Sequence, residues 1–321
     1  MNPSVWRLRL EAWWHGYDAE EYSAWRAGNG ATAESSDGLS IDLPELPSLD
    51  FDDVPPQDPL WPSARIDVAE RLFGPGYTVP GGAEEVVELV KPMALTPVHS
   101  FLDLSAGMGG PGAALVQRYG VWVTGYEPNA ALASTAETRL PTLKGGDQVS
   151  VRHYDPESIS LRSKSFDAIL SQDAMHRVQD KNRLLAQVHD ILKDWGQFVM
   201  TDYVLTKGDG PSPHARRWID TLPPPVALWT KDVYETALAD LGFDIRIVED
   251  RSASHAELIR KAFSQFLKKA GSEGLTSQPA EVAQALMREA EDWARRAALL
   301  ASGEIALYRF FVIKPGDDSN G

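Results

Sequence analysis

Residues 100–112 read SFLDLSAGMGGPG, and this stretch decides the fold class. An apolar strand ends in the carboxylate of Asp103, and the chain then turns through glycines into a helix. Glycines let backbone N–H groups approach a ligand closely, and the N-terminus of a helix favours negative charge. The stretch therefore predicts a strand, a ligand-binding turn and a helix within an α/β sheet.

Short apolar runs alternate with helical patterns around this stretch. Strands are predicted at Ser100–Leu104, Trp122–Glu127, Val149–Asp155, Phe166–Gln172, Gln197–Val204, Phe243–Glu249 and Ile305–Lys314. Helices are predicted at Ala83–Ala94, Gly112–Tyr119, Asn129–Arg139, Lys181–Leu192, Thr230–Leu241, Ala256–Lys269 and Glu281–Leu300. This alternation predicts an α/β fold with a doubly wound, seven-stranded, mostly parallel sheet of the Rossmann-like kind.

Composition divides the chain into parts. Residues 1–30 hold an amphipathic helix or cap, Val5–Trp25, expected to pack on the main domain, with another protein as the alternative partner. Residues 31–60 carry eight acidic side chains, five prolines and no Lys or Arg, so we expect a linker or strap there. The main domain is predicted over 61–315, with a helical insertion at 252–302 and a disordered tail at 316–321.

Charge and residue content narrow the function classes. The 321 residues include 31 basic and 46 acidic side chains, a formal net charge of −15, which argues against nucleic acid or anionic membrane as partners. No cysteine is present, which excludes disulfides and thiolate metal sites. No apolar run reaches the ~18 residues of a membrane-spanning helix, and no secretory leader is expected. We expect a cytoplasmic protein with a small-molecule partner, and a homodimer stays open.

Polar side chains end consecutive predicted strands. Glu127 lies 24 residues after Asp103, where a carboxylate can accept both ribose hydroxyls of an adenosine. Asp155 ends the third strand and can accept the adenine amino group, and Asp173 follows the fourth. Because ligands of open α/β sheets bind at the carboxyl ends of the strands, this pattern predicts a nucleoside ligand there.

The spacing Gly107-x-Gly109-x-x-Gly112 also satisfies the dinucleotide fingerprint. An NAD-binding oxidoreductase is therefore an alternative. Asp103 argues against it, because that fingerprint keeps its strand apolar up to the first glycine, and no hydride-transfer constellation follows.

The motif Asp103-x-x-x-Gly107-x-Gly109, with the strand ends above, resembles the class I S-adenosylmethionine-dependent methyltransferases over about residues 65–314. The resemblance implies a seven-stranded sheet with an antiparallel last strand. It also implies that the Asp103 turn holds the methionine end of the cofactor, Glu127 the ribose and Asp155 the adenine. The full set of implied cofactor contacts is Tyr77, Gly81, Gly82, Asp103, Ser105, Gly107, Gly109, Glu127, Pro128, Asp155, Ser171 and Gln172. Ser105 replaces the glycine usual in that family.

The segments Phe73–Gly82, Ser171–Ala174 and Thr201–Tyr203 are similar to phosphoethanolamine and glycine/sarcosine N-methyltransferases. In that group the first of these segments folds over the cofactor as a lid. The phosphobase enzymes pair a lid Tyr with a His, and Trp61 and Arg177 stand at those positions here. Their phosphate clamp falls near Pro224 and Val226, which disfavours a phosphobase substrate.

These features predict a methyltransferase that transfers the methyl group of S-adenosylmethionine to a small-molecule amine or hydroxyl. Asp173, His176 and Tyr203 are the candidate catalytic residues, and no metal is expected. His176 is either a general base, since imidazole titrates near neutral pH, or a structural loop residue. The alternative is a catalytically altered protein of this fold that binds a nucleoside or a partner protein.

Two further expectations concern the acceptor. The predicted loop Gly208–Pro225 carries Arg216 and Arg217, which either contact a carboxylate or stay solvated. An aromatic lining is expected from Trp61, Tyr77, Tyr203, Trp218 and Trp229.

Overall fold

The computed structural model describes residues 60–222, 226–273 and 279–316. The predicted N-terminal helix, almost all of the acidic strap, Pro224 and the tail beyond Gly316 lie outside these residues. The division into domains therefore stays a prediction.

The centre of the molecule is a seven-stranded sheet with the order β3-β2-β1-β4-β5-β7-β6. Its strands are β1 (Ser100–Asp103), β2 (Trp122–Glu127), β3 (Val149–His153), β4 (Phe166–Gln172), β5 (Leu192–Leu205), β6 (Asp244–Asp250) and β7 (Ile305–Ile313). Strand β7 is antiparallel to both β5 and β6, whereas the other pairs are parallel. The predicted fold class, including the antiparallel last strand, is confirmed.

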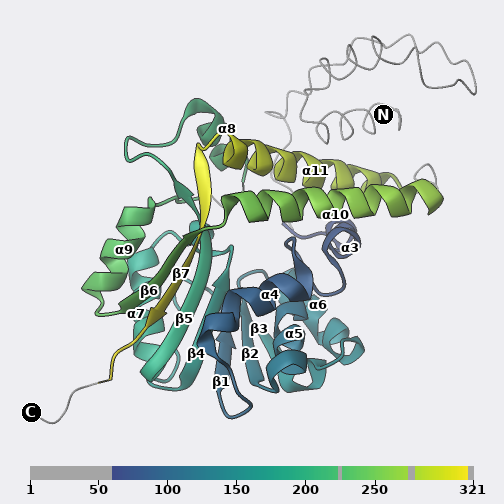
Figure 1. The fold of residues 1–321 in the computed structure, drawn as a ribbon. Coiled ribbons are helices and arrows are strands. Elements are labelled where there is room, and N and C mark those ends of the chain that lie inside the picture. The colour runs from purple at the N-terminus through teal and green to yellow at the C-terminus, as the bar shows by residue number, and fades with distance from the viewer. Residues whose placement is uncertain (1–59, 223–225, 274–278, 317–321) are drawn as a thin grey trace, which may run out of the picture.

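Helices cover both faces of this sheet because its strands are apolar on both sides. The helices α4 (Gly82–Val90), α5 (Gly110–Tyr119) and α6 (Ala130–Arg139) lie on one face, and α7 (Lys181–Ile191) and α9 (Lys231–Asp240) on the other (Figure 1). Phe101 and Leu102 are neighbours on β1, yet Phe101 packs with α4 and α5 while Leu102 packs with α7. Successive side chains of β1 thus belong to two different hydrophobic layers, one on each face of the sheet.

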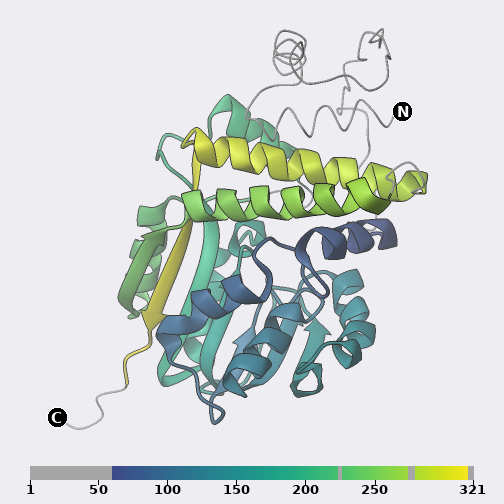
Figure 2. The same cartoon turned by 45° about the vertical axis from the view of Figure 1, so that its right-hand side comes forward.

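A third group of helices lies across the carboxyl ends of the strands, and we call this group the roof. It comprises α3 (Ser63–Phe73), α8 (Pro213–Thr221), α10 (Ser252–Glu273) and α11 (Ala280–Ala301), of which α10 and α11 form a long hairpin (Figures 1 and 2). Their apolar faces share one core cluster with Tyr203 of β5. The roof therefore closes the edge of the sheet at which the predicted site residues lie.

The main differences from the sequence prediction concern three elements. Helix α8 occupies part of the predicted loop Gly208–Pro225, because Ser212 caps its N-terminus by accepting the N–H of Ala215 at 3.0 Å. Helix α3 was not predicted. Strand β5 begins at Leu192 rather than Gln197. Trp195 takes a φ of +64° within an irregular stretch, after which the pairing with β4 resumes at Gln197.

Candidate functional site

Asp103 ends β1 completely buried at the carboxyl edge of the sheet. Its Oδ1 accepts hydrogen bonds from the Ser105 N–H at 2.9 Å and the Ser105 hydroxyl at 3.0 Å. The Ser105 Oγ in turn accepts the N–H of Gln172 at 2.7 Å. Two buried acceptors, Asp103 Oδ2 and Gln172 Oε1, have no partner among the described residues. Burial raises the pKa of Asp103 to about 6.

Glu127 joins the end of β2 to the glycine turn. Its Oε2 accepts the Gly107 N–H at 2.8 Å, and its Oε1 accepts the Asn129 N–H at 2.8 Å. Gly107 has a φ of +52°, a left-handed conformation that favours glycine, and this conformation aims its N–H at the carboxylate. Burial raises the pKa of Glu127 to about 7. The structure therefore brings Asp103, Ser105, Gly107, Glu127 and Gln172 together at the carboxyl edge of the sheet, and their contact with a cofactor stays a prediction.

Residues 74–82, which we call the lid segment, lie directly on this turn. The Gly110 N–H donates to the Gly76 carbonyl at 3.1 Å, and the Tyr77 hydroxyl donates to the Gly110 carbonyl at 3.0 Å. A Cβ on Gly110 would lie 2.7 Å from the Gly76 carbonyl oxygen, so the two backbones touch only because both residues are glycines. Thr78 also lies beside Gly107, where an added Cβ would meet the Thr78 hydroxyl at an ordinary contact distance of 3.5 Å.

The remaining predicted cofactor residues lie around this centre. Gly81 and Gly82 start α4, and Gly81 packs beside Leu258 of α10. Pro128 continues β2, and Ser171 is buried within β4. Gly109 precedes α5 with a φ of +91° and packs against Leu140.

Asp155 differs from the other strand-end carboxylates because it is exposed. Its oxygens accept the Glu157 N–H and the Ser158 hydroxyl, both at 2.9 Å, and the bond from Glu157 contributes most to lowering its pKa. Asp155 therefore caps a turn in this structure, and its adenine contact stays a prediction.

Asp173 follows β4 with a φ of +50°, a strained conformation for a residue other than glycine. The Thr201 hydroxyl donates to Asp173 Oδ1 at 2.7 Å, and the Asp173 N–H donates to the Thr201 carbonyl at 2.9 Å. Burial raises the pKa of Asp173, against the effect of the Thr201 hydrogen bond. The neighbouring strand β5 thus holds this carboxyl at the edge of the sheet.

His176 is buried and bonded to a residue that the sequence analysis did not select. Asp202 Oδ1 lies 2.8 Å from His176 Nδ1 and accepts the His176 backbone N–H at 2.9 Å. Asp202 Oδ2 accepts the hydroxyl of Tyr234 at 2.6 Å. His176 Nε2 is buried without a partner among the described residues. His176 is therefore part of a buried hydrogen-bond network with Asp202 and Tyr234 rather than an isolated loop residue.

Tyr203 connects this group to the roof. Its hydroxyl lies 2.8 Å from Nε2 of His255 on α10, and its ring meets His176 edge-on, with centroids 5.3 Å apart. Arg296 of α11 lies 5.7 Å from the Tyr203 ring centroid and donates to Asp292 at 2.6 Å. Burial and the charge of Arg296 lower the pKa of Arg177 to about 10.

Arg177 follows His176, whereas Arg296 lies on α11 in the roof. No local sequence pattern therefore predicts that these two arginines lie near each other. Arg216 and Arg217, in contrast, are exposed on α8.

The expected aromatic lining is divided between two clusters. Trp218 is fully buried and meets Tyr203 edge-on, at 5.7 Å between ring centroids. Trp61 and Tyr77 pack at the edge of this same cluster. Trp229 instead packs against Tyr234 in the cluster under α9.

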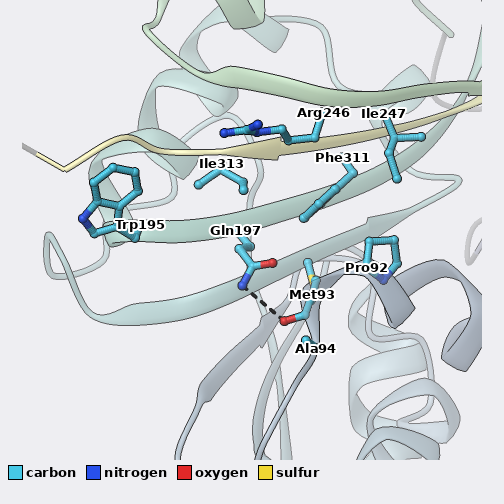
Figure 3. A pocket seen from close by; sticks show the side chains of 9 residues that line it. All are labelled: Pro92, Met93, Ala94, Trp195, Gln197, Arg246, Ile247, Phe311 and Ile313. Atoms are coloured by element: carbon cyan, nitrogen blue, oxygen red, sulfur yellow. Dashed lines mark hydrogen bonds between the residues drawn. The ribbon is translucent and has the colours of Figure 1, made fainter.

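A surface pocket of about 470 Å³ lies at the opposite edge of the sheet, near the amino ends of β5 and β6 (Figure 3). Pro92 and Met93 border it on one side and Arg246 and Phe311 on another, and the Gln197 side chain donates to the Met93 carbonyl at 3.2 Å. None of the predicted site residues lines this pocket.

Within residues 60–222, 226–273 and 279–316, no cluster of His, Asp and Glu has the arrangement of a metal site. In the same part of the chain, no helix is long and apolar enough to cross a membrane.

Comparison with known proteins agrees with this geometry. Residues 102–200 match the model of a methyltransferase domain. Phosphoethanolamine N-methyltransferase 1 of Zea mays is 29% identical over 199 residues, which are 62% of this chain and 39% of that protein. The chain thus spans about two fifths of the length of that relative.

Solved structures show the same fold. Phosphoethanolamine N-methyltransferase 2 of Haemonchus contortus, in complex with phosphomonomethylethanolamine and S-adenosylhomocysteine, superposes with a TM-score of 0.69 at 19% identity, covering 78% of this chain and 57% of that one. A putative sarcosine dimethylglycine methyltransferase from Galdieria sulphuraria gives 0.64 at 18% identity, covering 79% and 99%.

The chain therefore contains a methyltransferase domain over residues 102–200, and its sheet has the Rossmann-like methyltransferase fold. In sequence it is similar to the phosphoethanolamine N-methyltransferases. The NAD-binding alternative loses its support, because the glycine turn that suggested it belongs to the matched methyltransferase domain.

Proposed function

We propose that the protein transfers the methyl group of S-adenosylmethionine to the nitrogen or oxygen of a small-molecule acceptor. The observation that carries this proposal is the pair of buried, unpartnered acceptors, Asp103 Oδ2 and Gln172 Oε1, on either side of Ser105. Buried acceptors without donors are costly, and the ammonium group of a methionine moiety would supply the missing donors.

The other residues fit the rest of this cofactor. Glu127 presents a carboxylate beside the Gly107 N–H, where ribose hydroxyls can donate to it. The lid segment lies over the turn and would exclude water from the bound cofactor. S-adenosylmethionine, when bound, supplies a methyl group on an already activated sulfonium.

The protein's own contribution is therefore to orient the acceptor and to receive its proton. Asp173 and His176 are the proposed proton acceptors, and the Tyr203 hydroxyl steadies the polar group of the acceptor. We propose an uncharged or zwitterionic acceptor, because Val226 is buried in an apolar cluster where the phosphobase enzymes carry their phosphate clamp.

Calorimetric titration with S-adenosylhomocysteine tests the cofactor assignment. Asp103→Asn and Glu127→Ala are expected to abolish binding, whereas Asp167→Asn, at the amino end of β4, should retain it within about threefold. Binding that persists in the first two variants would overturn the assignment.

Methyl transfer from S-adenosylmethionine to ethanolamine, sarcosine and phosphoethanolamine tests the acceptor class. We expect phosphoethanolamine to be the poorest of the three, and efficient methylation of it would contradict the proposed class. Cofactor binding without turnover on a wide panel of amines and alcohols would favour the catalytically altered alternative.

A further inference from the structure

Asp202 of β5 receives three donors from two residues, His176 and Tyr234. The backbone N–H and the ring Nδ1 of His176 both converge on Oδ1, at 2.9 and 2.8 Å, and the Tyr234 hydroxyl of α9 reaches Oδ2 at 2.6 Å. Both Asp202 and His176 are essentially inaccessible to solvent. A carboxylate accepts hydrogen bonds and donates none, so the proton of a neutral His176 ring must sit on Nδ1.

The network therefore assigns the tautomer of His176 and leaves Nε2 with a free lone pair. Nε2 is on the side of the ring away from Asp202, and it has no partner within the part of the chain that the structure describes. A buried nitrogen lone pair without a donor is unfavourable unless a ligand supplies that donor. An acceptor molecule carrying an N–H or O–H group would do so.

Charged and titratable groups face this ring from every side. Asp202 and Tyr203 lie on β5, Asp173 and Arg177 flank His176 in the chain, and Arg296 reaches it from α11. Burial lowers the pKa of His176, Asp202 opposes that change, and Arg177 and Arg296 reinforce it. The ring is therefore neutral near pH 7, as a base must be before it takes a proton.

We propose, on the basis of the proposed methyltransferase function, that Asp202 is a positioning residue that holds His176 with Nε2 directed at the acceptor as the base of the reaction. The lone pair of the acceptor nitrogen or oxygen forms the new bond to the methyl carbon, and the carbon–sulfur bond breaks with its electron pair going to sulfur. Nε2 takes the proton released by the acceptor atom. The Asp202 carboxylate then stabilises the positive charge of the ring.

Nitrogen NMR of the histidine rings tests the positioning part without knowledge of the acceptor. In the full-length protein with S-adenosylhomocysteine added, His176 is expected to carry its proton on Nδ1 at pH 7, and His176→Gln identifies its signals. Asp202→Asn should lower the pKa of His176, because it removes the negative charge that opposes the effect of burial. Asp167→Asn is the control and should leave those signals unchanged.

Tyr234→Phe gives a second, milder variant in case Asp202→Asn does not fold. It removes one donor from Asp202 without removing the charge, so the pKa of His176 should rise rather than fall. A proton on Nε2 at pH 7, or a His176 titration unchanged in both variants, would overturn the inference.

Kinetics with the acceptor that turns over in the panel above test the catalytic part. Asp202→Asn should lower kcat by about 10- to 100-fold, with the KM of the acceptor and the affinity for S-adenosylhomocysteine within threefold of wild type. The acidic limb of the kcat profile should move to lower pH, following the pKa of His176. An unchanged kcat would refute the role of Asp202. If no acceptor turns over at all, the proposed function fails, and the ring spectra still decide the Asp202 inference.

Discussion

At the scale of single residues, Asp103 places a carboxyl group in a buried position beside the glycine turn. Asp103 is completely buried, and one of its oxygens has no donor among the described residues. Because burial raises its pKa to about 6, an ionised Asp103 lowers the stability of the free protein at any pH above that value. This cost is typical of a residue selected for binding rather than for stability.

Asp103→Asn should therefore stabilise the free protein at pH 8, by on the order of 2 kcal/mol. The remaining side-chain oxygen can still accept both hydrogen bonds from Ser105. Urea denaturation without cofactor measures the gain, and the same variant should show no rise in melting temperature with S-adenosylhomocysteine. A variant less stable than wild type at pH 8 would contradict this account of Asp103.

The buried ring of His255 makes the stability of the protein depend on pH in the opposite direction to Asp103. Burial lowers its pKa to about 3, whereas the unfolded residue titrates near 6.5. The unfolded chain thus binds the extra proton first, so the stability contributed by neutral His255 is complete above pH 6.5 and is lost on acidification toward pH 3. Glu127 has the opposite effect on stability. Burial raises its pKa to about 7, so its ionisation lowers the stability of the protein as the pH rises through that value.

His255→Gln should remove this acid sensitivity while keeping an acceptor for the Tyr203 hydroxyl. Between pH 7 and 5 the variant should lose about 2 kcal/mol less stability than the wild type. Denaturant titrations at several pH values provide the comparison, with the exposed His153→Gln as control. Parallel stability curves for wild type and His255→Gln would show that His255 is not buried as a neutral ring.

At the scale of elements, the contact between the lid segment and α5 depends on two facing glycines. A Cβ on Gly110 would lie within 3 Å of the Gly76 backbone, although the helical conformation of Gly110 itself accommodates alanine. Gly110→Ala should therefore displace the lid segment and weaken S-adenosylhomocysteine binding at least tenfold, with little loss of helix stability. Gly208→Ala, which meets nothing within 4 Å, is the matched control. Equal affinities in calorimetry would show that the lid segment does not contribute to binding.

At the scale of the whole molecule, the two edges of the sheet have separate roles. The carboxyl edge carries the candidate site under the roof, whereas the pocket bordered by Arg246 and Phe311 lies at the amino edge. Arg246→Ala removes an exposed charge paired only with the exposed Asp244 in the described structure. We expect its cofactor affinity and turnover to stay within twofold of wild type, and a larger change would indicate coupling across the sheet.

The sheet and the glycine turn after β1 could be predicted from the sequence because their signals are local. The predicted bounds of β2 and β4 agree with the structure residue for residue, and Asp103 and Glu127 lie where their strands end. Helix α8 was not predicted, because the prolines around it are also typical of a loop. His255 of α10 and Arg296 of α11 meet at Tyr203 of β5, and no periodicity in the sequence predicts this contact.

The insertion of α10 and α11 between β6 and β7 has a consequence for protein engineering. The two strands are neighbours, and the insertion leaves and re-enters the sheet at one edge, where the Arg251 N–H donates to the Leu307 carbonyl at 2.8 Å and the Leu307 N–H to the Ser252 hydroxyl at 3.0 Å. These two hydrogen bonds join the start of the hairpin to β7, into which its other end leads. Because the apolar faces of α10 and α11 share a core cluster with α3 and α8, we expect a chimera that exchanges the hairpin between related enzymes to fold only when the facing residues of α3 and α8 are exchanged with it.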